Sequence, residues 1–291
     1  MLSAAAPRLL LLRSFLSSEE AGYLAALAEA AGLEPSRVVA PGGGVSAART
    51  SRGTWLTKLR GKDATVDAVE ARLAAASGLP QAFGEGLHVL EYEAGQKYDP
   101  HLDACVRLGG GGGGEQGKAQ SEDCQGFLRR ARGPACGAGA GGATCGDRLA
   151  TMVMMLHAPE EGGETVFPAA ASAVLPADAL SAGAADGAAA GNATAEAEPG
   201  AIRASTGPCD APGVFKIRPA VGDALLFWNY LPRADLPSGV DHETYARSGT
   251  WADGSADTEA ALDPGALHGG CPVRRGRKVI MTRWWRASAL H

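Results

Sequence analysis

The segment from Glu85 to Asp103 constrains the fold more than any other part of the chain. Its first half places alternate side chains on opposite faces: Leu87, Val89 and Glu91 on one, and His88, Leu90 and Tyr92 on the other. A period of two is typical of a β-strand. The chain then turns at residues 93–96 and continues as an extended segment that ends in His-x-Asp. The pattern predicts two strands joined by a turn.

The His-x-Asp motif offers two metal-binding groups at one point. Residues two apart on an extended backbone face the same side, so His101 and Asp103 can converge. An imidazole and a carboxylate are two of the three ligands in the 2-His-1-carboxylate triad that binds Fe(II). Because the motif is short, an ordinary solvated strand end is the alternative.

The C-terminal part of the chain supplies a third ligand candidate, His268, within residues 266–273. Residues 222–228 predict a turn followed by a buried strand, and Arg274-Arg275-Gly276 predicts a hairpin turn into another strand over 277–285. His268 and Lys278 are therefore expected on adjacent antiparallel strands. A histidine and a lysine so placed suit a 2-oxo acid that chelates a metal at one end and carries a carboxylate at the other.

Five motifs resemble those of the plant and algal prolyl 4-hydroxylases, which are Fe(II)- and 2-oxoglutarate-dependent dioxygenases. They are residues 49–56, 98–103, 161–168, 222–228 and 267–273, and they occur in this order. The resemblance covers nearly the whole chain apart from three insertions. Motifs of this length in a fixed order are far more specific than a metal triad alone.

The resemblance implies a fold that is mainly β with flanking helices, an α+β protein built on a double-stranded β-helix, or jelly-roll, core. Residues 1–84 are expected to pack on the core as a strand and helix region, and residues 85–288 to form the dioxygenase domain. Insertions of low complexity are expected at about 106–146, 169–212 and 231–264.

The resemblance also assigns the cofactors. His101, Asp103 and His268 would hold Fe(II), and Lys278 would bind the distal carboxylate of 2-oxoglutarate, helped by the hydroxyl of Thr165 or Tyr92. For Thr165, stabilisation of the turn is an equal alternative. Dioxygen would be the oxidant, and L-ascorbate the reductant that rescues oxidised iron.

The implied reaction is hydroxylation of peptidyl proline at C4 in proline-rich proteins, with 2-oxoglutarate converted to succinate. Tyr98 and Trp284 are candidates for gripping a polyproline II helix, with simple packing as the alternative. Glu85 and Arg148 match residues of the peptide groove, with a structural ion pair as the alternative. A 2-oxoglutarate oxygenase with another substrate and a non-catalytic peptide-binding module remain alternative functions.

The composition of the chain and its N-terminal sequence limit the partners and the location to be expected. Hydrophobic residues make up 45% of the chain and the formal net charge is −5, which favours a globular protein and argues against binding to nucleic acid. The apolar run Leu9–Leu12 is too short for a signal peptide or a membrane helix. Membrane association is therefore not visible, and a location in the endoplasmic reticulum or secretory pathway is expected from the resemblance alone. The oligomeric state stays open.

Helices are predicted at about Ser18–Ala31, where Ser17 and Glu20 fit a capping box, and at Lys62–Ser77. The chain has six cysteines, at 105, 124, 136, 145, 209 and 271. A zinc site is disfavoured, because the spacings are irregular and none is C-x2-C. Disulfides are favoured, with free thiols as the alternative, and the pairing stays open. His88 and His157 are interpreted as ordinary strand residues, and His242 is not nominated as a ligand.

Overall fold

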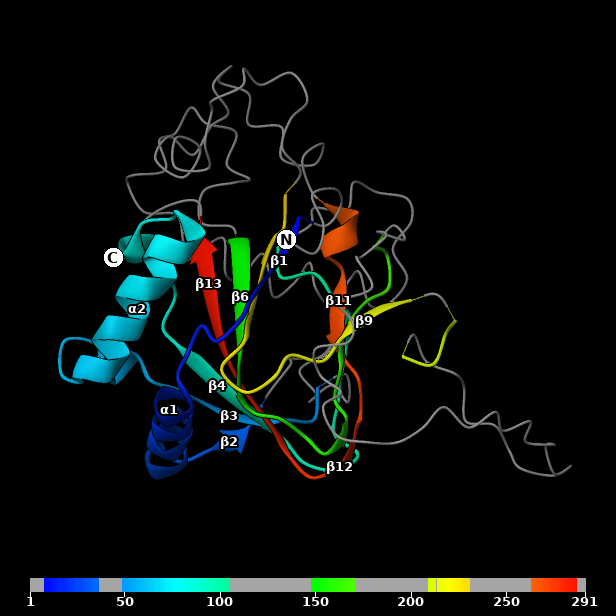
Figure 1. Ribbon diagram of the computed structural model, residues 1–291, viewed down its shortest axis with the longest axis horizontal. Helices are drawn as coiled ribbons and strands as arrows, with labels where there is room; N and C mark the ends of the chain where they lie inside the picture. The colour runs from blue at the N-terminus through cyan, green and yellow to red at the C-terminus, as the bar shows by residue number, and fades with distance from the viewer. Residues whose placement is uncertain are drawn as a thin grey trace, which may run out of the picture.

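A computed structural model describes residues 8–36, 49–104, 148–170, 209–212, 214–230 and 263–286. These residues form a seven-stranded sheet, a four-stranded sheet and a two-stranded pair, all antiparallel, with helices beside the large sheet (Figure 1). The predicted class is confirmed: the protein is mainly β with flanking helices on a jelly-roll core. Most of the three expected insertions, and with them His242 and four of the cysteines, lies outside the described residues.

The seven-stranded sheet contains the strands predicted from apolar runs. Its order is β1 (Leu9–Leu12), β10 (Ala224–Trp228), β6 (Arg148–His157), β13 (Lys278–Arg286), β4 (His88–Tyr92), β3 (Arg52–Trp55) and β2 (Glu34–Pro35). The long strands β6 and β13 are central, and three strands that precede residue 85 belong to the same sheet. β1 ends at Leu12, because Ser14 has a φ of 48° and the Asp223 carboxylate accepts hydrogen bonds from Arg13 and Ser14.

The four-stranded sheet has the order β5 (Tyr98–His101), β11 (His268–Gly270), β8 (Thr165–Phe167) and β9 (Phe215–Ile217). The expectation that His268 and Lys278 lie on adjacent strands is therefore wrong, since Lys278 begins β13 of the other sheet. The reason is a crossover: β12 (Val273–Arg275) pairs with β7 (Glu161–Gly162), not with β13. Gly276, with a φ of 80°, then turns the chain toward the large sheet.

Helices α1 (Ser18–Ala31) and α2 (Ala64–Ser77) cover one face of the large sheet (Figure 1). The capping box of Ser17 and Glu20 is present at α1, as predicted. α2 begins two residues later than predicted, because the Asp63 side chain accepts a hydrogen bond from the Val66 amide and so caps the helix there. Short 3-10 helices occur at η1 (Thr57–Leu59), η2 (Gln81–Phe83) and η4 (Pro264–Ala266).

The two faces of β4 serve different cores, as its alternation predicts. Leu87 and Val89 pack with the helices, whereas Leu90 and Tyr92 belong to a second apolar cluster between the two sheets. The inner face of the large sheet is therefore free to contribute side chains to a cavity between the sheets.

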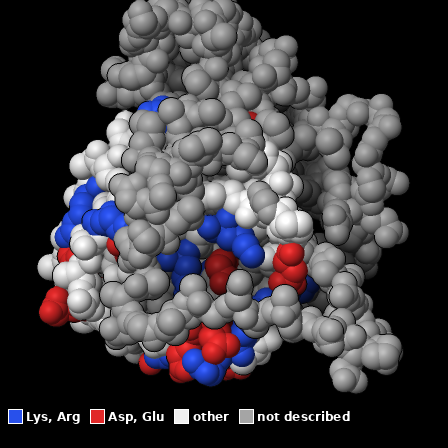
Figure 2. Space-filling model, turned by 45° about the vertical axis from the view of Figure 1, so that its right-hand side comes forward, with Lys and Arg blue, Asp and Glu red and all other residues white. Residues whose placement is uncertain are grey.

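On the face shown in Figure 2, Lys and Arg side chains of the described chain lie interspersed with Asp and Glu side chains. Among the described residues, no helix is long and apolar enough to cross a membrane. Cys209 and Cys271 form a disulfide, which settles the pairing that the sequence left open for these two cysteines.

Candidate active site

A cavity lies between the two sheets, and both sheets contribute to it. The large sheet supplies polar side chains from β4, β6 and β13, and the small sheet supplies the two histidines nominated from the sequence. The cavity lining includes the side chains of Arg49, Trp55, His88, Tyr92, Tyr98, His101, Asp103, Arg148, Thr151, Thr165, His268, Cys271, Lys278 and Trp284.

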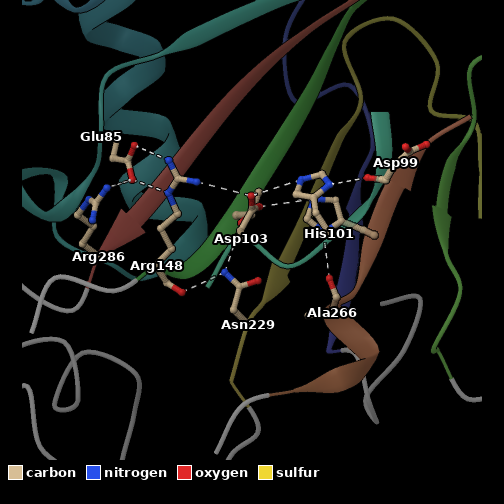
Figure 3. A network of polar contacts seen from close by, with 10 residues as sticks. Glu85, Asp99, His101, Asp103, Arg148, Asn229, Ala266 and Arg286 are labelled. Atoms are coloured by element: carbon tan, nitrogen blue, oxygen red, sulfur yellow. Dashed lines mark hydrogen bonds and ion pairs between the residues drawn. The ribbon is translucent and has the colours of Figure 1, made fainter. Parts of the chain in front are cut away.

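His101, Asp103 and His268 converge at this cavity, as predicted. His101 and His268 face each other across β5 and β11, which pair at these two positions. The Asp103 carboxylate lies 3.7 Å from His101 Nε2 and 3.5 Å from His268 Nε2, and the three ligand atoms lie within 4.8 Å of one another. Figure 3 shows Asp103 turned toward His101.

Backbone carbonyls orient both imidazole rings. His101 Nδ1 lies 2.9 Å from the Asp99 carbonyl oxygen, and His268 Nδ1 lies 2.9 Å from that of Ala266. A carbonyl oxygen only accepts, so each Nδ1 must carry the proton. In the neutral rings, Nε2 is then the unprotonated nitrogen, and both Nε2 lone pairs are directed at the Asp103 side. This second hydrogen bond is the usual support of a metal-binding histidine.

The protonation states favour a ligand set and not a set of ion pairs. Burial, with the charge on His268, lowers the pKa of His101 to about 3, so its ring is neutral at neutral pH. Burial alone would raise the pKa of Asp103, but His268, His101, Arg148 and the Thr151 hydroxyl hold it at about 2. An ionised carboxylate therefore faces the unprotonated Nε2 of His101, with the Nε2 of His268 also within 3.5 Å of it.

Three electron-pair donors at one point repel one another unless a Lewis acid lies between them. Two imidazole nitrogens and one carboxylate on one side, with the remaining directions open to a cavity, are the donor set of non-haem Fe(II) oxygenases. The residues present therefore fit a divalent iron ion.

Lys278 places a second charge in the same cavity. Its side chain is 3% exposed, and its Nζ donates a hydrogen bond of 2.6 Å to the Gly163 carbonyl oxygen. Burial lowers its pKa to about 8, although Glu164 opposes the shift. A backbone carbonyl does not neutralise an ammonium group, so the site suits a ligand carboxylate. Tyr92 and Thr165, the other predicted co-substrate residues, line the same cavity.

The predicted substrate residues divide into two groups. Tyr98 and Trp284 line the cavity: the Tyr98 ring stacks on His101 at 3.7 Å between centroids, and the Arg148 guanidinium lies 4.0 Å from the centre of the Trp284 ring. Glu85 is part of an ion-pair network. Its carboxylate accepts two hydrogen bonds from the Arg148 guanidinium, at 2.7 and 2.9 Å. A nitrogen of the Arg286 guanidinium lies 2.6 Å from Glu85 Oε1 (Figure 3).

Sequence reasoning missed several cavity residues. His88, interpreted as an ordinary strand residue, lines the cavity and stacks on Trp55 with ring centroids 4.2 Å apart and an angle of 7° between the planes. Burial, followed by the charges of Arg49 and Arg148, lowers the pKa of His88 to about 3. The signal was present in the sequence, because the alternation of β4 places His88 on the same face as Tyr92. His157 lies exposed at the end of β6, away from this cavity.

Comparison with known proteins identifies the family. The family model of the 2OG-Fe(II) oxygenase superfamily matches residues 87–286. The chain is 33% identical to probable prolyl 4-hydroxylase 3 of Arabidopsis thaliana over 280 residues, which cover 96% of this chain and 69% of that protein. It is 30% identical to prolyl 4-hydroxylase 5 of the same plant, covering 96% of this chain and 68% of that protein.

Among solved structures, the chain is similar to the viral collagen prolyl hydroxylase of Paramecium Bursaria Chlorella virus-1 in its 2OG complex. The TM-score is 0.49 at 19% identity, with 96% of this chain and 95% of that chain covered. The assignment of the family rests on the sequence matches, whose span includes both histidines, Asp103 and Lys278. The chain belongs to the prolyl 4-hydroxylases of the 2OG-Fe(II) oxygenase superfamily.

Proposed function

We propose that this oxygenase hydroxylates peptidyl proline at C4 in proline-rich polypeptides. The observation that carries the proposal is the pairing of a two-histidine, one-carboxylate cluster with a buried lysine in one cavity between the sheets. The cluster suits Fe(II), and the lysine suits the far carboxylate of 2-oxoglutarate.

The residues divide the work as follows. His101, Asp103 and His268 would hold Fe(II), and Lys278 would pair with the distal carboxylate of 2-oxoglutarate, with Thr165 and Tyr92 as hydroxyl donors. When bound, Fe(II) and 2-oxoglutarate activate dioxygen, with one oxygen atom entering the substrate and 2-oxoglutarate leaving as succinate and carbon dioxide. The apolar side chains of the second cluster limit the access of water to this end of the cavity.

Aromatic and cationic side chains would bind the peptide. Tyr98 and Trp284 offer ring faces against which a polyproline II helix can pack, and Arg148 offers hydrogen bonds to its carbonyl groups. Trp55, 45% exposed at the cavity, would extend this aromatic surface. Glu85 would act through Arg148, because the bidentate ion pair holds the guanidinium beside Trp284.

The test is mass spectrometry of a proline-rich peptide incubated with the protein, Fe(II), 2-oxoglutarate and ascorbate. One added oxygen atom per modified proline, absent when 2-oxoglutarate is omitted, is the expected result. Parallel reactions without ascorbate test its proposed role in rescuing oxidised iron, which predicts an early loss of activity over successive turnovers.

Two other outcomes separate the alternatives. Succinate release without oxidation of the peptide would favour an oxygenase with another substrate. Binding of metal and peptide with neither product would favour a non-catalytic peptide-binding module.

We also propose that the protein works in the secretory pathway. Three features support this location. The chain resembles prolyl 4-hydroxylases, for which a secretory location is expected, and Asn192-Ala193-Thr194 is an N-glycosylation sequon. The Cys209–Cys271 disulfide also fits, because disulfides persist in oxidising compartments. Sensitivity of the protein from its native cells to endoglycosidase H would support the proposal, and a reduced, unglycosylated protein would contradict it.

A further inference from the structure

Asp103 differs from the two histidines in how it is held. Both histidines lie within paired strands, whereas Asp103 lies beyond the last paired residue of β5. The direction of its carboxylate therefore depends on side-chain contacts. The shortest of these is a hydrogen bond of 2.7 Å from the Thr151 hydroxyl to Asp103 Oδ2, whereas the Arg148 guanidinium lies 3.7 Å from Oδ1.

Thr151 is a well-fixed donor. It lies in the middle of β6, is 0% exposed, and pairs across the ladder with Phe227 on one side and Trp284 on the other. A β-branched side chain has few rotamers in a strand. A hydroxyl has one proton, and an ionised carboxylate only accepts, so that proton goes to Asp103 and the lone pairs of Thr151 remain available.

The Asn229 side chain supports the Thr151 hydroxyl. This fully buried residue follows β10, and its Nδ2 donates a hydrogen bond of 3.0 Å to the Arg148 carbonyl oxygen and another of 3.5 Å to Thr151 Oγ1 (Figure 3). The carbonyl contact fixes which end of the amide faces Thr151, since only the nitrogen can donate. The result is a directed chain from Asn229 to Thr151 to Asp103.

The backbone of Asn229 reaches a second ligand. Its amide donates to the Leu149 carbonyl at 2.8 Å, and its own carbonyl accepts from the Asp263 amide at 2.9 Å. The Asp263 carbonyl in turn accepts from the Ala266 amide at 3.0 Å. The Ala266 carbonyl then accepts the proton of His268 Nδ1 at 2.9 Å.

From these two series of hydrogen bonds, one through the Asn229 side chain and one through its backbone, we propose that Asn229 and Thr151 are positioning residues of the metal site. The Asn229 side chain, through Thr151, fixes the Asp103 carboxylate, and the Asn229 backbone sets the turn that orients His268. This inference rests on the proposed function, because it concerns the same ligand set. It assigns a role to two residues outside the set of three metal ligands.

The experiment measures the affinity of the metal-free full chain for Mn(II), followed by electron paramagnetic resonance without co-substrate. Thr151→Val removes the hydroxyl and keeps the shape, and we expect it to weaken Mn(II) binding roughly 10-fold or more. Thr151→Ser keeps the donor and is the matched control, with an affinity close to that of the wild type. The Co(II) absorption spectrum of each variant reports the ligand geometry independently of affinity.

A double variant of Asn229 and Thr151 tests whether Asn229 acts on Asp103 through Thr151. Asn229→Ala alone should weaken Mn(II) binding less than Thr151→Val, because the hydroxyl proton remains. If Asn229 acts through Thr151, the double variant should bind Mn(II) no more weakly than Thr151→Val alone. Thermal unfolding of the metal-free variants identifies any general loss of folded protein.

Wild-type affinity in folded Thr151→Val, with an unchanged Co(II) spectrum, would overturn the inference and leave the proposed function intact. Equal losses in Thr151→Ser and Thr151→Val would also overturn it. If the wild-type protein bound neither Mn(II) nor Fe(II), the proposed function itself would fail, and the inference with it.

Discussion

Two groups of polar side chains, each centred on a buried carboxylate, lie on opposite sides of the seven-stranded sheet, and they differ in how fully that carboxylate is matched by hydrogen-bond donors. The sealed cluster, Arg60, Glu70, Gln81 and Arg283, lies on the face covered by α2. The open cluster, His101, Asp103 and His268, lies on the face that borders the cavity.

In the sealed cluster, the Glu70 carboxylate is saturated by protein donors. The Glu70 carboxylate, in a residue 1% exposed, accepts hydrogen bonds from Arg60 at 2.7 and 2.8 Å, from Gln81 at 3.0 Å and from Arg283 at 3.0 Å. Arg283 also donates to the carbonyls of Gln81 and Glu85. Burial lowers the pKa of Arg283 to about 10, which still leaves it charged at neutral pH.

The open cluster is less fully matched, because its three ligand atoms lie too far apart to hydrogen-bond well to one another. The Asp103 carboxylate lies 3.5 Å from His268 Nε2 and 3.7 Å from His101 Nε2, beyond ordinary hydrogen-bond length. The comparison teaches that buried charge alone does not mark a functional site. A buried set whose donors and acceptors fail to match calls for a ligand, whereas a matched set stabilises the fold.

The largest expected effect is on the open cluster. Asp103→Asn replaces a carboxylate by a neutral amide of the same shape, so metal-dependent turnover should fall more than roughly 100-fold while the fold is kept. Turnover and Mn(II) affinity are measured together. Asp210→Asn, which alters an exposed ion pair with Arg274, is the control and should behave as wild type. Full turnover in Asp103→Asn would break the comparison.

The sealed cluster should respond in stability instead. Glu70→Gln leaves Arg283 buried with its charge uncompensated, so the free energy of unfolding should fall by about 3–5 kcal/mol. Mn(II) affinity of the folded fraction should be unchanged. Denaturant unfolding at neutral pH measures the first quantity, and a variant as stable as wild type would show that the cluster is not a structural element.

The sealed cluster also predicts how the stability of the fold changes as the pH falls. Burial alone would raise the pKa of Glu70, but the hydrogen bond from Arg60 and the charge of Arg283 lower it below its usual 4.5. Its contribution to stability is therefore present above pH 4.5 and is lost as the pH falls through the lowered pKa.

Lys278 joins the two halves of the comparison, since it is a buried cation with no carboxylate in hydrogen-bond contact within the described chain. Lys278→Ala should raise the Kd for 2-oxoglutarate roughly 30-fold or more, the equivalent of losing about 2 kcal/mol. Mn(II) binding without co-substrate should not change. Isothermal titration measures both, and an unchanged Kd for 2-oxoglutarate would refute the role given to this residue.

The smallest expected effect is a pH profile. Because burial lowers the pKa of Lys278 to about 8, its charge is lost as the pH rises above that value in the absence of co-substrate. The affinity for 2-oxoglutarate should then fall by up to about tenfold per pH unit above pH 8. Lys278→Arg keeps its charge throughout and should give a flat profile over the same range. A flat profile for the wild type would show that the lysine stays charged.

Much of this protein follows from its sequence alone. Alternation in residues 87–92 determined a strand with two different faces, and the capping box fixed the start of α1, because both depend on near neighbours in the chain. His-x-Asp is likewise a local device: two residues on an extended backbone face the same side. The ordered motifs indicated the family.

Tertiary structure alone decided how distant residues meet. A crossover through β12 separates His268 from Lys278 and places them on opposite sheets, an outcome that the hairpin signal at Gly276 concealed. The support of Asp103 by Thr151 and Asn229 is equally invisible in sequence, because 48 and 78 residues separate the members of each hydrogen bond. Local patterns fix what each strand presents on its faces. Only the packing of the two sheets determines which faces share a cavity.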